Sequence, residues 1–77
     1  MELNEIIKAV YDRAVRSMQD VENLRENKKA GEPVSNIHYY GHMGERNAWV
    51  EAYSIIANIP YEIAYCEIYD ASLGWNG

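Results

Sequence analysis

The first thirty residues carry a helical hydrophobic pattern, and this pattern constrains the fold more than any other feature of the chain. Apolar residues recur at intervals of four and three from Leu3 to Leu24, with Ser17 as the one interruption. This spacing places them on one face of an α-helix, and that face must be covered by another part of the chain. The stripe consists of Leu3, Ile7, Val10, Ala14, Val21 and Leu24, widened by Ile6, Tyr11 and Met18.

A stop signal and a new start follow this helix. Ala30-Gly31 favours the left-handed conformation in which many helices end, and Pro33 prevents the helix from resuming. Ser35 or Asn36 then suits the N-cap of a second helix, because a short polar side chain accepts hydrogen bonds from free backbone N–H groups. The sequence therefore predicts a helical hairpin.

Small residues form a row along the expected second helix. Two glycines inside a helix cost ~1 kcal/mol each relative to alanine, and close approach of another helix is the simplest compensation. That helix is either the first one or the same helix of a second copy. Alternatively, the second helix starts only at Gly44. We expect the helical version, in a homodimer packed through Gly41, Gly44, Ala48 and Ala52, with Ile37, Ile55 and Ile59 continuing the row.

Residues 60–73 fit either a helix or a strand. As a helix, Ile63, Ala64 and Ile68 face inward and three tyrosines form a row at four-residue spacing. As a strand, the segment uses residue types that favour sheets. The helix is favoured, because the chain offers no second strand and a lone strand leaves its backbone unpaired. The expected fold is therefore all-α, a helical hairpin plus a short third helix, with residues 1–77 in one domain.

The length of 77 residues is that of one small domain. A chain this short has a thin core, so oligomerisation is expected. The lone Cys66 excludes an internal disulfide and is typical of a reducing compartment. No signal-peptide pattern appears, and no apolar run approaches the roughly 18 residues of a membrane span. We expect a cytoplasmic protein that makes no membrane contact.

The charge is distributed unevenly along the chain. All seven basic residues lie at or before Arg46, which leaves four carboxylates uncompensated after it. This surface repels duplex nucleic acid and suits a basic protein partner. Tyrosine is enriched in protein interfaces. The predicted partner-binding residues are Glu51, Tyr61, Glu62, Tyr65, Glu67, Tyr69, Asp70 and Trp75.

Two small-ligand sites are alternatives to a protein-binding surface. His38, His42 and Glu45 share one helical face and are chemically suitable metal ligands, but they lack the glutamate of the metalloprotease pattern. Around the glycines, Arg46 could hold the phosphate of a small nucleotide while Tyr40 or Trp49 stacks on its base at a dimer interface. We expect neither a metal nor a cofactor, and we keep the nucleotide site as the alternative function.

Residues suited to nucleophilic catalysis are sparse, because nothing in the sequence brings a serine or Cys66 to a histidine and an acid. We therefore expect no enzyme activity.

The stretch "GERNAWVEAYSIIANI" together with the Gly31-Glu32-Pro33 turn resembles the small accessory proteins of bacterial viruses and mobile elements, over residues 3–59. This resemblance implies a non-enzymatic inhibitor or modulator of a host or defence protein. Some proteins of this class instead sequester nucleotides. No functional residue is carried over from the resemblance.

Overall fold

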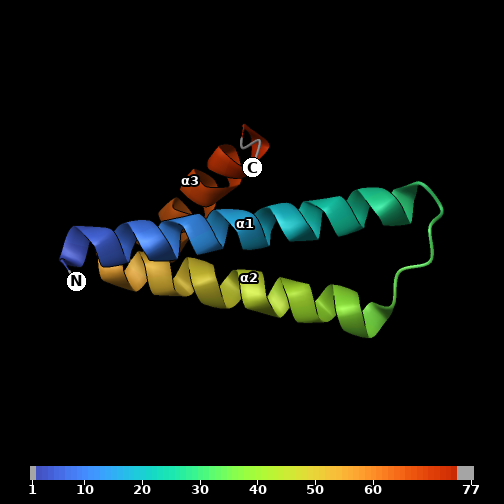
Figure 1. The fold of residues 1–77 in the computed structure, drawn as a ribbon, viewed down its shortest axis with the longest axis horizontal. Coiled ribbons are helices and arrows are strands. Elements are labelled where there is room, and N and C mark those ends of the chain that lie inside the picture. Colours follow the sequence, from blue (N-terminus) through green and yellow to red (C-terminus); the bar gives the residue numbers. More distant parts are fainter. Residues whose placement is uncertain (1, 75–77) are drawn as a thin grey trace.

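The structure is a computed structural model that describes residues 2–74, and in this part of the chain it contains three α-helices and no strand (Figure 1). The helices are α1 (Leu3–Lys29), α2 (Asn36–Ala57) and α3 (Tyr61–Leu73). The all-α prediction is confirmed, including the helical alternative for the third segment and the glycine-containing start of α2.

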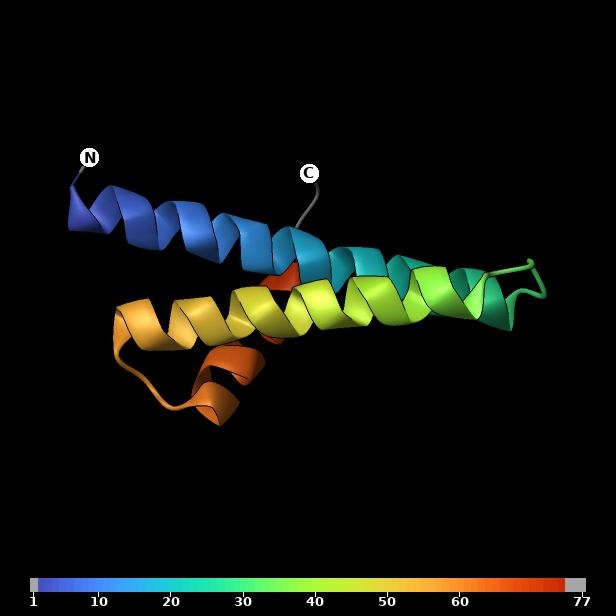
Figure 2. The same ribbon diagram turned by 90° about the horizontal axis from the view of Figure 1, so that it is seen from below.

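The long helices α1 and α2 run side by side in opposite directions, and α3 packs across both of them near the end where α1 begins and α2 ends (Figures 1 and 2). The molecule is elongated, with extents of 43 × 24 × 23 Å. The core lies where the three helices meet. Its buried members are Ala14, Val15, Met18, Val50, Tyr53, Ala64 and Ile68.

The opposite end of the hairpin has no third helix over it, and a polar cluster joins α1 to α2 there. Arg25 Nε donates to Tyr39 Oη at 3.4 Å, and Arg25 Nη1 lies 3.1 Å from Glu22 Oε1. These contacts, the hydrogen bond to Tyr39 first, raise the pKa of Arg25 above its usual value. Lys28 Nζ lies 5.4 Å from the centre of the Tyr39 ring. The cluster therefore holds the far end of the hairpin without a large apolar core.

The helices end near the predicted positions, but the side-chain capping bond predicted at the start of α2 is wrong, because none is formed there. Gly31 has φ of +86°, a conformation that costs glycine little, and the N–H of Glu32 bonds back to the carbonyl of Asn27. At the start of α2, the Ser35 carbonyl accepts from the Tyr39 N–H, while its side chain makes no capping bond. Asn58 ends α2 with φ of 56°, also left-handed.

The predicted stripe of α1 is correct in its middle and wrong at its start. Ser17, the polar interruption, is itself buried with Met18 and Val21, so the stripe continues through it. Leu3 is exposed, because it lies in the first turn, where no other helix covers it.

The small-residue row of α2 does not approach α1, so that alternative is wrong. Gly41, Gly44 and Ala48 are exposed, and a Cβ atom added to either glycine meets nothing within 4 Å. The opposite side of α2 packs inward instead, through Val50 and Tyr53. Burying these two larger side chains removes more apolar surface from water than burying glycine and alanine does.

One residue of α3 also differs from its predicted orientation. Ile63 was expected in the core and is exposed, whereas Tyr65 and Tyr69 are half-buried against the core. The buried stripe of this helix is Ala64, Ile68 and Ser72. Tyr65 and Tyr69 lie beside that stripe and extend the contact of α3 with the hairpin.

Two isoleucines of α3 provide a matched test of this orientation. We expect Ile68→Ala to lower the free energy of unfolding by about 2–5 kcal/mol, because it empties a fully buried site. Ile63→Ala is expected to change it by at most about 0.5 kcal/mol, because Ile63 is exposed. Urea unfolding followed by circular dichroism measures both values, and equal losses would contradict the orientation of α3.

Candidate interaction surfaces

The outward side of α3 combines carboxylates with uncovered apolar side chains. We call Glu62, Ile63, Cys66, Asp70 and Leu73 the α3 outer face, since all five are exposed. Ile63 is 57% exposed and Leu73 is 68% exposed, although both are large apolar residues. The residues recur three or four positions apart, so they share one side of the helix. This side therefore presents exposed apolar side chains near both ends of α3, interspersed with negative charge.

The tyrosine row expected on this surface lies elsewhere. Tyr65 is half-buried, and the guanidinium carbon of Arg46 lies 5.5 Å from the centre of its ring. Tyr69 packs against the core. Tyr61 is the most exposed of the three, and its ring centre is 6.2 Å from that of Tyr65. Tyr65 and Tyr69 thus pack against the hairpin rather than lining the outward side of α3, whereas Tyr61 is exposed.

Glu67 is exposed, but it has a structural partner. Tyr53 Oη donates to Glu67 Oε1 at 2.8 Å, which connects α2 to α3. Burial of Tyr53, together with this hydrogen bond, raises the pKa of its phenol to about 12. The ring of Tyr53 also meets that of Tyr11 edge-on, with centres 5.4 Å apart. Glu67 therefore holds α3 in place and is a less suitable contact residue than Glu62 or Asp70.

The remaining predicted contact residues do not join the α3 outer face. Glu51 is exposed on α2. Trp75 lies outside the described residues. Of the predicted contact residues, Glu62 and Asp70 therefore lie together on the α3 outer face. Ile63 and Leu73 lie on the same face and were not predicted as contact residues. A spacing of three, four and three from Ile63 through Cys66 and Asp70 to Leu73 was the available signal.

A second exposed apolar surface runs along α2. Ile37 is 87% exposed and Ile55 is 70% exposed, and Gly41, Gly44 and Ala48 lie exposed between them. Ala52, predicted as a dimer contact with these small residues, is half-buried at the edge of this surface. Nothing within the described chain covers the small-residue row.

The residues of the alternative ligand site do not converge within the chain. Arg46 is only 6% exposed, and its Nε and Nη2 donate to Asn47 Oδ1 at 3.1 and 3.0 Å. Trp49 faces α1, where the Arg13 guanidinium lies 5.6 Å from its ring centre. Tyr40 is exposed. These three side chains therefore lie in three different environments and do not form one ligand site.

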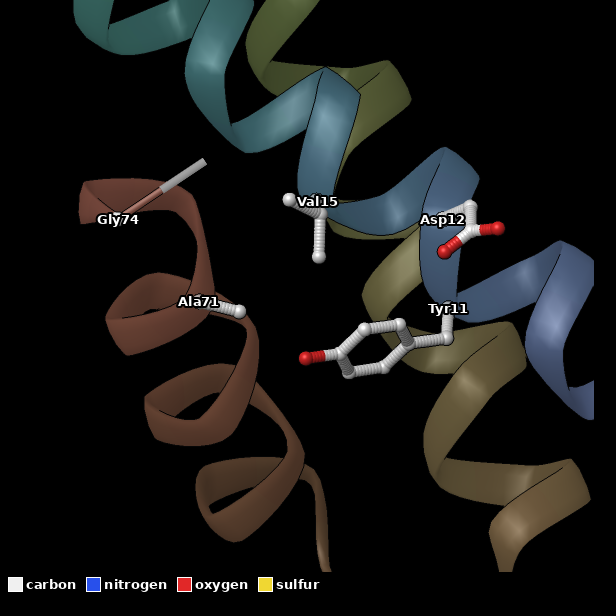
Figure 3. Close-up of a pocket in the computed structure, with 5 residues that line it drawn as sticks. All are labelled: Tyr11, Asp12, Val15, Ala71 and Gly74. Atoms are coloured by element: carbon white, nitrogen blue, oxygen red, sulfur yellow. The ribbon is translucent and has the colours of Figure 1, made fainter. Parts of the chain in front are cut away.

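A small pocket lies between α1 and α3, away from these three residues (Figure 3). The Tyr11 ring extends from α1 toward α3, whereas the Asp12 carboxylate points away from α3. The volume of the pocket is about 210 Å³, below the roughly 300 Å³ at which typical ligand pockets begin. Asp12 is already paired with Lys8 at 3.1 Å. The pocket therefore gives no support to a nucleotide site. Its lining residues are Tyr11, Asp12, Val15, Ala71 and Gly74.

The two histidines contact each other. Their rings meet edge-on with centres 4.5 Å apart, as expected for residues one helical turn apart. Glu45 does not complete a ligand set with them, since no three His, Cys, Asp or Glu side chains within residues 2–74 are arranged to hold a metal ion. His38 and His42 therefore form a ring pair on the surface of α2.

Ser54, Ser72 and Cys66 are nucleophile candidates on α2 and α3. The hydroxyl groups of Ser54 and Ser72 each donate at 2.7 Å to the carbonyl three residues earlier, so both serve their own helix. Cys66 is an exposed free thiol on α3.

No protein-family model, no curated protein and no solved structure matches this chain. In the described segment, none of the helices has both the length and the apolar character that crossing a bilayer requires. The functional interpretation accordingly depends on the geometry of the exposed surfaces.

The contact between Tyr53 and Glu67 leads to a pH-dependent prediction. We expect Tyr53→Phe to lower the free energy of unfolding by about 1–3 kcal/mol at pH 7, because a hydrogen bond to a charged group is lost. The phenol has its raised pKa, about 12, only in the folded state, so its stabilising effect is complete below pH 10 and is lost between pH 10 and 12.

Urea unfolding of both proteins between pH 7 and 11.5 measures this effect. The difference between wild type and variant is expected to narrow above pH 10, while alkaline effects on the other tyrosines and on the lysines are common to both proteins. A difference that stays constant to pH 11.5 would contradict the assigned role of Tyr53.

Proposed function

We propose that this chain is a non-enzymatic protein-interaction module that binds a basic protein partner through the α3 outer face. The observation that carries the proposal is the exposure of Ile63 and Leu73 beside the carboxylates of Glu62 and Asp70. Exposed apolar side chains beside carboxylates offer both the apolar contact area and the polar groups that protein interfaces contain. The adjacent negative charges would attract a basic partner and orient it on contact.

The charge of α3 supports the choice of partner. Residues 61–73 contain no lysine or arginine, so Glu62, Glu67 and Asp70 have no basic neighbour on their own helix. Surface charges of one sign raise the association rate with an oppositely charged partner, and salt weakens this effect. Binding is therefore proposed to weaken as ionic strength rises.

Two finer elements belong to the same proposal. The resemblance to accessory proteins of bacterial viruses implies that the partner is a host or defence protein, which the bound chain inhibits or modulates. The exposed small-residue row of α2 supports self-association of the chain as a homodimer. The α3 outer face and this row lie on different helices and share no residue.

Capture of a partner tests the proposal. A tagged chain is incubated with a lysate of the source cells, and bound proteins are identified by mass spectrometry. We expect Glu62→Lys with Asp70→Lys to reduce capture of a basic protein at least tenfold, since both charges of the surface are reversed. Ile63→Ala is expected to reduce it as well, and circular dichroism confirms that each variant retains its helices.

The matched control is Glu26→Lys with Glu32→Lys, which changes the net charge equally at exposed sites outside α3. This control is expected to retain capture. Equal loss in both pairs would point to net charge alone, and unchanged capture by the α3 variants would refute the proposed surface.

A further inference from the structure

We infer that His38 and His42 form a two-histidine site on α2 for a divalent ion of a late transition metal, with Cu²⁺ bound more tightly than Zn²⁺. One imidazole nitrogen from each ring would hold the ion, and water would occupy its other coordination positions. The inference goes beyond the proposed function, because it uses no residue of the α3 outer face. It also replaces the expectation from the sequence that the chain binds no metal.

The two histidines of the chain lie one helical turn apart on α2. Residues at this separation have Cβ atoms about 5–6 Å apart, so their side chains can reach a common point. The two rings already meet edge-on, with centres 4.5 Å apart. An ion bound at about 2.1 Å by each nitrogen keeps the two nitrogens within about 4.2 Å of each other. Rotation of the side chains is therefore enough for both rings to share one ion.

The ring nitrogens are available to such an ion. His38 is exposed and His42 is half-buried, so both rings can be reached from solvent. Within residues 2–74, the contact that these rings make is with each other, and no hydrogen bond or ion pair engages either of them. A neutral imidazole has one nitrogen with a free lone pair, which a metal ion can accept. The net charge of −5 also favours a cation over an anion.

The two ligands select the class of ion. Imidazole suits Cu²⁺, Ni²⁺ and Zn²⁺, whereas Mg²⁺ and Ca²⁺ prefer oxygen ligands. Affinity for a given nitrogen site rises along the first row to Cu²⁺ and falls again at Zn²⁺. Glu45 follows His42 by three residues, but no three His, Cys, Asp or Glu side chains in the described part of the chain surround one point. The site therefore differs from a closed structural zinc site, which has four protein ligands.

An ion at this site would stabilise the start of α2. The first turn of this helix contains no acidic residue, and the Ser35 side chain makes no capping bond. An ion shared by His38 and His42 joins the first turn to the second. The two rings are held one turn apart only while the helix is formed. The ion therefore binds the folded chain more tightly than the unfolded chain and raises the melting temperature.

Titration of Cys66→Ser protein with Cu²⁺ tests the site, since this background removes an exposed thiol that also binds copper. We expect one ion per chain, a rise in melting temperature, and an electron paramagnetic resonance spectrum with hyperfine couplings from two imidazoles. Zn²⁺ is expected to bind at least about tenfold more weakly. His38→Ala is expected to weaken Cu²⁺ binding at least about tenfold and to leave one imidazole coupling, because the second ring otherwise binds intramolecularly.

The matched control exchanges two exposed residues of α2, as His38→Tyr with Tyr40→His. This variant keeps the amino-acid composition and two histidines, but residues two positions apart do not face each other on a helix. We expect it to lose Cu²⁺ binding as fully as His38→Ala does. Glu45→Gln is expected to change the affinity by less than about threefold, because this carboxylate is not a ligand. Circular dichroism confirms that each variant retains its helices.

Three results would overturn the two-histidine site. The first is a loss of affinity below tenfold in His38→Ala, and the second is binding by the exchanged variant as tight as in the parent. The third is a larger than threefold loss in Glu45→Gln, since a third protein ligand would then be present. Partner capture through the α3 outer face is measured without added metal, so the failure of either proposal leaves the other intact.

Discussion

Tyr53 is the residue on which the arrangement of the three helices depends. It belongs to α2, its ring meets Tyr11 of α1, and its hydroxyl bonds to Glu67 of α3. It is also a buried member of the core that Met18 and Ile68 complete. Because α3 is only 13 residues long, it has little stability of its own and is held by this packing. This contact therefore helps to fix the position of the α3 outer face relative to the hairpin.

A core of this size leaves apolar side chains uncovered, and their surroundings differ between the two surfaces. On α3, Ile63 and Leu73 lie among carboxylates, whose charge the proposed basic partner would complement. On α2, Ile37 and Ile55 enclose small residues and one carboxylate, which suits a closely packed helix with little charge. The chemistry of each surface therefore favours a different occupant.

The helices could be predicted from the sequence, but not all of their inward sides. The pattern of α1, the stop at Gly31 and the break before Pro60 specify the three segments by local rules. Both α2 and α3 have two sides that contain apolar residues, and periodicity alone does not decide which side is buried. In α2 the side with the larger side chains is buried, and in α3 Tyr65 and Tyr69 pack beside the buried stripe of Ala64, Ile68 and Ser72. Arg46 contacts Tyr65, which lies 19 positions further along the chain, and this contact takes Arg46 away from the alternative ligand site. No local sequence pattern predicts a contact over that separation.

The placement of the two surfaces on different helices has a consequence for binding strength. A pair of chains joined through α2 would carry two copies of the α3 outer face, one on each subunit. A partner that itself has two binding sites, or many partners arrayed on one assembly, would then be held at both points. Once one point is attached, the second binds as an intramolecular event, and such avidity multiplies apparent affinity by about 10²–10⁴ where the geometry permits both contacts. Weak individual contacts on a chain of 77 residues would then suffice for tight attachment to a repetitive target.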